Sequence, residues 1–118
     1  MTPEVEVVRV LVAIEPKMYR EVLAFHLRQQ RPQSEVVLAS SENLEATAEY
    51  TRPHLTIANE VPPMLKEMGF WVEVSTDGRL EAHISADGYS TTLHDVSLEH
   101  LVAVVDKAEE ELAYYEEH

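Results

Sequence analysis

Two polar residues follow two apolar runs of the chain and mark the rim of a prospective active site. Glu15 comes directly after the run 7–14, and Asn59 comes directly after the run 54–58. A carboxylate can take up a phosphoryl group as an acyl phosphate, whereas an amide cannot. Magnesium prefers several oxygen ligands, usually carboxylates together with phosphate oxygens, and Glu15 supplies one carboxylate here. We therefore predict no catalytic residue, no metal ion and no cofactor at this place.

The histidines are the next candidates for metal ligands or general bases. His26 falls on the apolar side of a predicted helix, where we expect a core imidazole. His83 and His94 fall on the outer face of a predicted antiparallel meander, and the expected pairing sets them opposite Thr92 and Glu81. A zinc site needs its donors side by side. Two histidines without an adjacent third donor do not predict one.

A hydrolytic site is also disfavoured. The stretch 94–97 contains histidine, aspartate and serine, which are the residue types of a hydrolytic triad. Ser97, however, suits the cap of the helix that follows, and the glycines of a nucleophile elbow are missing around it. The chain has three glycines in all, too few for a glycine-rich phosphate loop.

The charge of the chain argues against two classes of partner. Nine lysines and arginines stand against 22 aspartates and glutamates, which gives a formal net charge of −13. Phosphate backbones and anionic membrane surfaces attract positive charge, so we expect neither nucleic-acid nor membrane binding. The negative charge either serves solubility alone or favours a basic partner protein. No apolar stretch approaches the roughly 20 residues of a membrane span, and without an export signal at residues 1–6 we expect a cytoplasmic location.

The first half of the chain alternates between strand-like and helix-like patterns. Apolar runs predict three strands, at 7–14, 35–39 and 54–58. Helical spacing predicts two helices between them, over 17–30 and from a cap at Ser41 to about residue 51. The inner stripe of the first helix is expected at Met18, Tyr19, Val22, Leu23, His26 and Leu27. Strands and helices that alternate in this way predict right-handed crossovers and a parallel sheet.

The second half changes to a short helix and an antiparallel meander. Residues 62–68 allow one or two helical turns, which Gly69 can close in the left-handed conformation. Two Asp-Gly turn signals predict an antiparallel meander over 70–94. A three-residue loop at 76–78 sets Phe70, Val72 and Val74 opposite Ile84, Ala82 and Leu80, and a two-residue turn at 87–88 adds Tyr89, Thr91 and Leu93 to the same face. Trp71 and His83 then face outward and form a candidate contact patch.

The last predicted helix begins at a Ser97 cap and carries one narrow apolar stripe. The stripe consists of Leu98, Leu101, Val105, Ala108, Leu112 and Tyr115, spaced by three and four residues in turn. Such a stripe either covers the sheet of its own chain or meets a second copy. Self-association through this helix therefore stays an open alternative.

The first half resembles the receiver domain of bacterial response regulators. The residues that carry the resemblance are the strand and helix at 10–23, the strand and loop at 52–59 with Pro63 beyond, and fainter echoes at 86–89 and 96–101. In that family two adjacent acids hold magnesium, and the resemblance puts Ile14 and Glu15 at their positions. The phospho-acceptor position falls on Asn59. The family's lysine, expected between the two fainter echoes, is missing.

The resemblance implies a flavodoxin-like, three-layer α/β sandwich. We expect parallel strands in the order 2-1-3, extended by the antiparallel meander and a long C-terminal helix, in a single domain over 1–118. The expected function is a non-enzymatic pseudo-receiver that binds a protein partner or itself through Trp71, His83, His94 and the stripe Leu101, Val105, Ala108, Leu112 and Tyr115. The alternative is a small enzyme or ligand-binding protein that uses the crevice near Glu15, Asn59 and Glu60.

Overall fold

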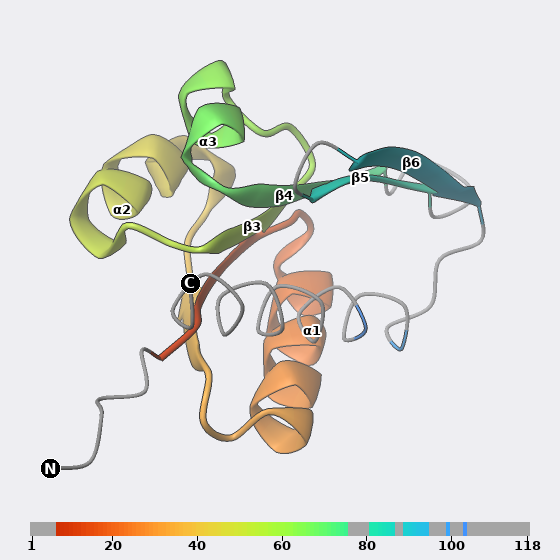
Figure 1. Cartoon of the computed structure of the whole chain (residues 1–118). Coiled ribbons are helices and arrows are strands. Elements are labelled where there is room, and N and C mark those ends of the chain that lie inside the picture. Colours follow the sequence, from red (N-terminus) through yellow and green to blue (C-terminus); the bar gives the residue numbers. More distant parts are fainter. Residues whose placement is uncertain (1–6, 76–80, 87–88, 95–98, 100–102, 104–118) are drawn as a thin grey trace, which may run out of the picture.

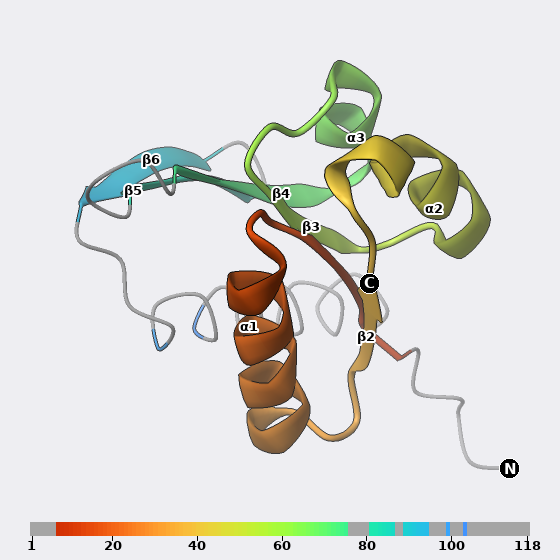
Figure 2. The same cartoon turned by 180° about the vertical axis from the view of Figure 1, so that it is seen from behind.

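Helices cover both faces of one twisted sheet in this computed structural model, which describes residues 7–75, 81–86 and 89–94 together with Glu99 and Ala103 (Figures 1 and 2). The strands are β1 (Arg9–Ala13), β2 (Glu35–Leu38), β3 (Leu55–Ala58), β4 (Phe70–Ser75), β5 (Glu81–Ala86) and β6 (Tyr89–His94). The helices are α1 (Lys17–Gln30), α2 (Leu44–Thr51) and α3 (Pro63–Met68), with a 3₁₀ turn η1 (Ser41–Asn43) before α2. The predicted α/β class with a parallel sheet is confirmed.

The sheet has the strand order β2-β1-β3-β4-β5-β6. Strands β2, β1, β3 and β4 run parallel to one another, whereas β5 and β6 are antiparallel. The expectation of three parallel strands was therefore one strand short. Helix α3 is the reason, because it forms a short crossover that brings the chain back to begin β4 beside the start of β3.

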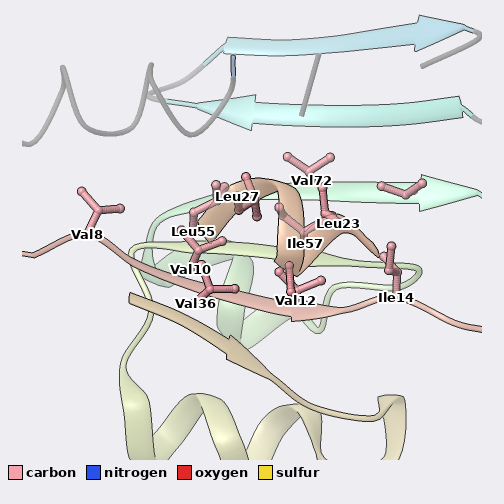
Figure 3. Close-up of a cluster of buried hydrophobic side chains, with 12 residues drawn as sticks. Val8, Val10, Val12, Ile14, Leu23, Leu27, Val36, Leu55, Ile57 and Val72 are labelled. Atoms are coloured by element: carbon pink, nitrogen blue, oxygen red, sulfur yellow. The ribbon is translucent and has the colours of Figure 1, made fainter. Parts of the chain in front are cut away.

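Apolar side chains bury both faces of the parallel strands, as their nearly continuous apolar sequence predicts. On one face, side chains of β1, β3 and β4 pack with Leu23 and Leu27 of α1 (Figure 3). On the other face, Leu11, Ala13 and Ala58 pack with the apolar side of α2 and with Leu65 of α3. Helix α1 thus lies opposite α2 and α3 across the sheet (Figure 1).

Helix α1 has the predicted bounds, but its buried face differs from the predicted stripe. Leu23, Ala24 and Leu27 are the buried residues of α1. The others of the stripe point outward: Met18, Tyr19 and Val22 are 63%, 41% and 43% exposed, and His26 is exposed as well, so it is not a core imidazole. The error has a physical cause. This helix carries apolar residues on two opposite sides, and a 3.6-residue period fits either set.

Two local predictions near α2 and α3 are also corrected. The helix expected from Ser41 opens with η1, and no side-chain hydrogen bond caps η1 or α2. Gly69 has an extended backbone, with φ 170°, instead of the left-handed one. A Cβ atom at Gly69 would lie 2.8 Å from the carbonyl oxygen of His54. That carbonyl accepts a hydrogen bond from the N–H of Phe70 at 3.1 Å. Because β3 and β4 approach closely there, position 69 has no room for a side chain.

The antiparallel pairings correct one register and confirm the other. Val72 and Val74 of β4 lie opposite Ile84 and Ala82 of β5. This pairing is shifted by two residues from the predicted one, so the faces are preserved, and the connection spans 76–80. On the β5–β6 side, His83 pairs with Thr92 and Glu81 with His94, as predicted. Among the described residues no helix is long and apolar enough to cross a membrane.

Of the predicted last helix, the structure describes Glu99 and Ala103, which are helical and exposed. Its cap at Ser97 and its stripe Leu98, Leu101, Val105, Ala108, Leu112 and Tyr115 lie outside the described residues. The long helix therefore remains a prediction.

The orientation of α1 can be tested with two neighbouring residues. Leu23→Ala should lower the free energy of unfolding by about 2–5 kcal/mol, because the Leu23 side chain is fully buried. Val22→Ala should change it by about 0.5 kcal/mol or less, because Val22 faces outward. Urea denaturation followed by circular dichroism measures both. Equal losses in the two variants would contradict the described buried face.

Candidate functional site

The carboxyl ends of β1 and β3 bring Glu15 and Asn59 together. The two strands are parallel neighbours, with Ala13 beside Ala58 in the ladder, so the residues that follow them emerge at the same edge of the sheet. In open α/β sheets this edge is where ligands usually bind. Glu15 and Asn59 therefore lie at one edge of the sheet, and their hydrogen bonds show how the two side chains are engaged there.

Both polar atoms of the Asn59 side chain form hydrogen bonds with backbone groups. Its Oδ1 accepts a hydrogen bond from the N–H of Glu15 at 2.6 Å. Its Nδ2 donates a hydrogen bond to the carbonyl oxygen of Val74 at 2.9 Å. We call this pair of bonds the Asn59 clasp. It joins the end of β3 to the ends of β1 and β4. The clasp needs one acceptor and one donor: an amide has both, whereas a carboxylate has acceptors but no donor.

Glu15 is held by groups from two other segments. Its Oε1 accepts hydrogen bonds from the N–H of Ser41 at 3.1 Å and from the Ser41 hydroxyl at 3.3 Å. Nη1 of Arg20 lies 3.1 Å from the same oxygen and also donates to the carbonyl oxygen of Ala39 at 3.0 Å. The backbone hydrogen bond from Ser41, helped by the Arg20 charge, outweighs desolvation and lowers the pKa of Glu15. Glu15 is 45% exposed, yet it connects the β1–α1 loop to the segment before α2.

A cavity of about 630 Å³ opens beside the clasp. The residues that line it are Ala13, Ser41, Glu42, Leu44, Glu45, Ala58, Asn59, Glu60, Pro62 and Pro63. The alanines at the strand ends are small, which leaves room between the start of α2 and the loop before α3. Three glutamates border the cavity, and neither Glu15 nor any lysine, arginine or histidine is among these described lining residues. An anionic ligand such as a phosphate is therefore disfavoured.

The predicted Trp71–His83 patch is only partly exposed to solvent. Trp71 is partly buried and packs with the cluster beneath α2 and α3. Nζ of Lys66 lies 4.4 Å from the centre of its ring and 3.4 Å from Oε1 of Glu73. Glu73 in turn accepts a hydrogen bond from the N–H of Val61 through Oε2 at 2.9 Å. His83 is exposed and pairs with Glu73, while Trp71 pairs with Ser85 further along β5.

One surface and the hydrogen-bond partners of Glu15 and Asn59 were not predicted from the sequence. The solvent-facing side of α1 carries Met18, Val22 and Phe25, which are 63%, 43% and 61% exposed. We call these three residues the α1 ridge. Their spacing of four and three residues was visible in the sequence. Ser41, Arg20 and Val74 gave no such signal, because they reach Glu15 and Asn59 through the fold.

Comparisons with models of known protein families, with curated protein sequences and with solved structures found no match. Among the side chains that the structure describes, no group of three or more His, Cys, Asp or Glu is placed to hold a metal ion. Function must therefore be argued from the clasp, the cavity and the surface.

The Asn59 clasp predicts that an aspartate at position 59, which a phospho-acceptor would require, makes the fold less stable. Asn59→Asp should lower the free energy of unfolding by about 1–3 kcal/mol at pH 7, because a carboxylate oxygen would then face the Val74 carbonyl without a donor. The loss should shrink as the pH falls, since a protonated carboxyl can donate. Urea denaturation at several pH values measures this, with the exposed Asn43→Asp as the matched control. If the Asn59→Asp variant is as stable as the native chain at pH 7, the result contradicts the clasp.

Glu15 predicts a pH dependence of stability. Its folded pKa lies below its ordinary value of 4.5, so between the two values the folded state binds fewer protons than the unfolded state. The stabilisation is present above the ordinary pKa and is lost as the pH falls through the lowered one. Glu15→Gln should therefore be less stable than the native chain at neutral pH, and the difference should close in acid. A difference that stays constant down to acid pH would contradict this assignment.

Proposed function

We propose that this chain is a non-catalytic protein-binding module of receiver-like form that cannot accept a phosphoryl group. The proposal includes a flavodoxin-like three-layer sandwich completed by a long C-terminal helix. It is supported by helices on both faces of a parallel sheet, and by Asn59 at the strand end where the resemblance puts the phospho-acceptor. The proposed location is the cytoplasm, where receiver domains of two-component signalling act.

The loss of chemistry is supported by how the edge of the sheet is built. The Asn59 amide is engaged at both ends by backbone, and Glu15 is engaged by Ser41 and Arg20. Phosphoryl transfer needs an acceptor and positive charge on the phosphate oxygens. The residues that line the cavity supply three carboxylates instead.

The α1 ridge is the observation that carries the protein-binding proposal. An isolated exposed apolar residue is ordinary, but neighbouring ones on one helix face usually mark an interaction site. Met18, Val22 and Phe25 lie on successive turns of α1, on the side that faces away from the sheet. They contribute nothing to the buried cluster that α1 forms with the strands.

The partner that we propose is a protein with an apolar contact strip set in a basic surface. The net charge of −13 would attract such a surface over distance and repel acidic ones, nucleic acids included. Trp71, His83 and His94 remain proposed contacts on the other side of the molecule. Self-association through Leu101, Val105, Ala108, Leu112 and Tyr115 also remains a proposal.

The cavity beside the clasp favours a second candidate function, which is binding of a small ligand or catalysis at the crevice. Its position at the carboxyl edge and its three carboxylates fit a small cationic ligand. This candidate is weaker, because the lining includes neither Glu15 nor a histidine and because the Asn59 amide is already engaged.

A photo-crosslinking amino acid placed at Phe25 tests the α1 ridge. In the cells that make the protein, Phe25 adducts should contain one recurring basic protein, because the ridge would lie in the interface. The matched control is the same group at Tyr50, which is 91% exposed on α2 across the sheet from α1. Adducts identified by mass spectrometry that are the same at both positions would contradict the proposal.

The absence of phosphoryl chemistry needs its own measurement on the purified protein. Magnesium and beryllofluoride, which imitates a bound phosphoryl group, should leave the amide NMR signals around Asn59 in place. Broad shifts there would contradict the proposal, and shifts caused by a small cation alone would favour the second candidate.

A further inference from the structure

Three residues of metal-ligating types occupy neighbouring positions on one face of the β5–β6 ladder. Glu81 and His83 are two residues apart on β5, so the pleat places both positions on the same face. His94 of β6 is the direct partner of Glu81 in the ladder. Directly paired positions have Cβ atoms roughly 4.5–5.5 Å apart, and diagonal neighbours such as His83 and His94 roughly 7–8 Å. The backbone thus brings three residues of metal-ligating types to neighbouring positions on one face of the ladder.

The confirmed pairing contains a third donor position, Glu81, which the prediction from the sequence did not count as a ligand. Thr92, not His94, lies opposite His83, which by itself argues against a histidine pair. Glu81, however, is adjacent to both histidine positions, since it shares a strand with one and is paired with the other. Two donors at alternate positions of one strand and a third directly across from one of them make a compact three-donor set.

The described neighbours of this triangle leave His83 open to solvent. His83 is exposed, and helix α3 packs on β4 at Trp71 through Lys66, not over His83. The corrected register of β4 and β5 puts Glu73 opposite His83. Its carboxylate is ion-paired with Lys66 and accepts a hydrogen bond from the N–H of Val61, so it is already engaged and does not belong to the donor set.

We propose that Glu81, His83 and His94 form a surface site for a divalent transition-metal ion, with zinc as the ion that suits the set best. Zinc binds imidazole nitrogen and carboxylate oxygen, and a site with three protein donors leaves a further position for water or for a partner's side chain. The site lies on the β5–β6 ladder, where Glu81 is paired with Ser75, the residue after Val74 of the Asn59 clasp. The proposal rests on the strand pairing and not on the proposed function, which names His83 and His94 as protein contacts.

Isothermal titration of the metal-free full chain with zinc chloride tests the site. We expect one ion per chain at this site, and a loss of affinity of about tenfold or more in each of His83→Gln, His94→Gln and Glu81→Gln. His26→Gln, which removes an exposed histidine on α1, is the matched control and should bind as the native chain does. Circular dichroism checks that the three variants keep the fold.

NMR of the native chain gives a second measurement that needs no substitution. The ring nitrogen signals of His83 and His94 should shift together as the first equivalent of zinc is added, while those of His26 stay in place. No binding, binding unchanged in Glu81→Gln, or ring shifts confined to other histidines would each overturn the proposal.

Discussion

One amide side chain holds together the edge of the sheet on which the interpretation of this protein depends. Asn59 accepts from the backbone of Glu15 and donates to the backbone of Val74, so it connects the ends of β1, β3 and β4. Removal of such a group leaves buried backbone partners unsatisfied, which is costly in a protein interior. In the proposed function, this amide stands at the phospho-acceptor position of a receiver. The proposal thus gives the stability of this edge and the loss of phosphoryl chemistry a single source, and a carboxylate introduced there is expected to weaken the fold.

Much of the first half was predictable because local patterns there agree with the tertiary structure. The apolar run before Glu15 forms a strand buried on both faces, and α1 has the expected ends. The buried side of α1 was not predictable, because Val22 and Leu23 are equally apolar and only the packed sheet decides between them. The extended backbone of Gly69 likewise depends on the His54 carbonyl, which belongs to another segment. The predicted last helix stays a prediction.

The candidate site shows the same division between local and long-range information. Glu15 and Asn59 were identified from their places after two apolar runs, and parallel pairing explains why they meet. Their partners Ser41 and Val74 could not be inferred, since those contacts depend on where the connecting loops pass. The observed register of β4 against β5 differs from the predicted one for a related reason. An Asp-Gly turn signal restricts a hairpin but does not fix its loop length.

Helix α1 is apolar on the side that faces water as well as on the side that faces the core. Apolar attraction at this helix and charge repulsion therefore act in opposite directions between copies of the protein. Met18, Val22 and Phe25 favour contact between copies, while the net charge of −13 drives the copies apart. Dissolved salt shortens the range of that repulsion to about 8 Å at physiological ionic strength, yet it leaves apolar attraction in place. A higher ionic strength therefore weakens the repulsion that opposes contact between copies at this helix face.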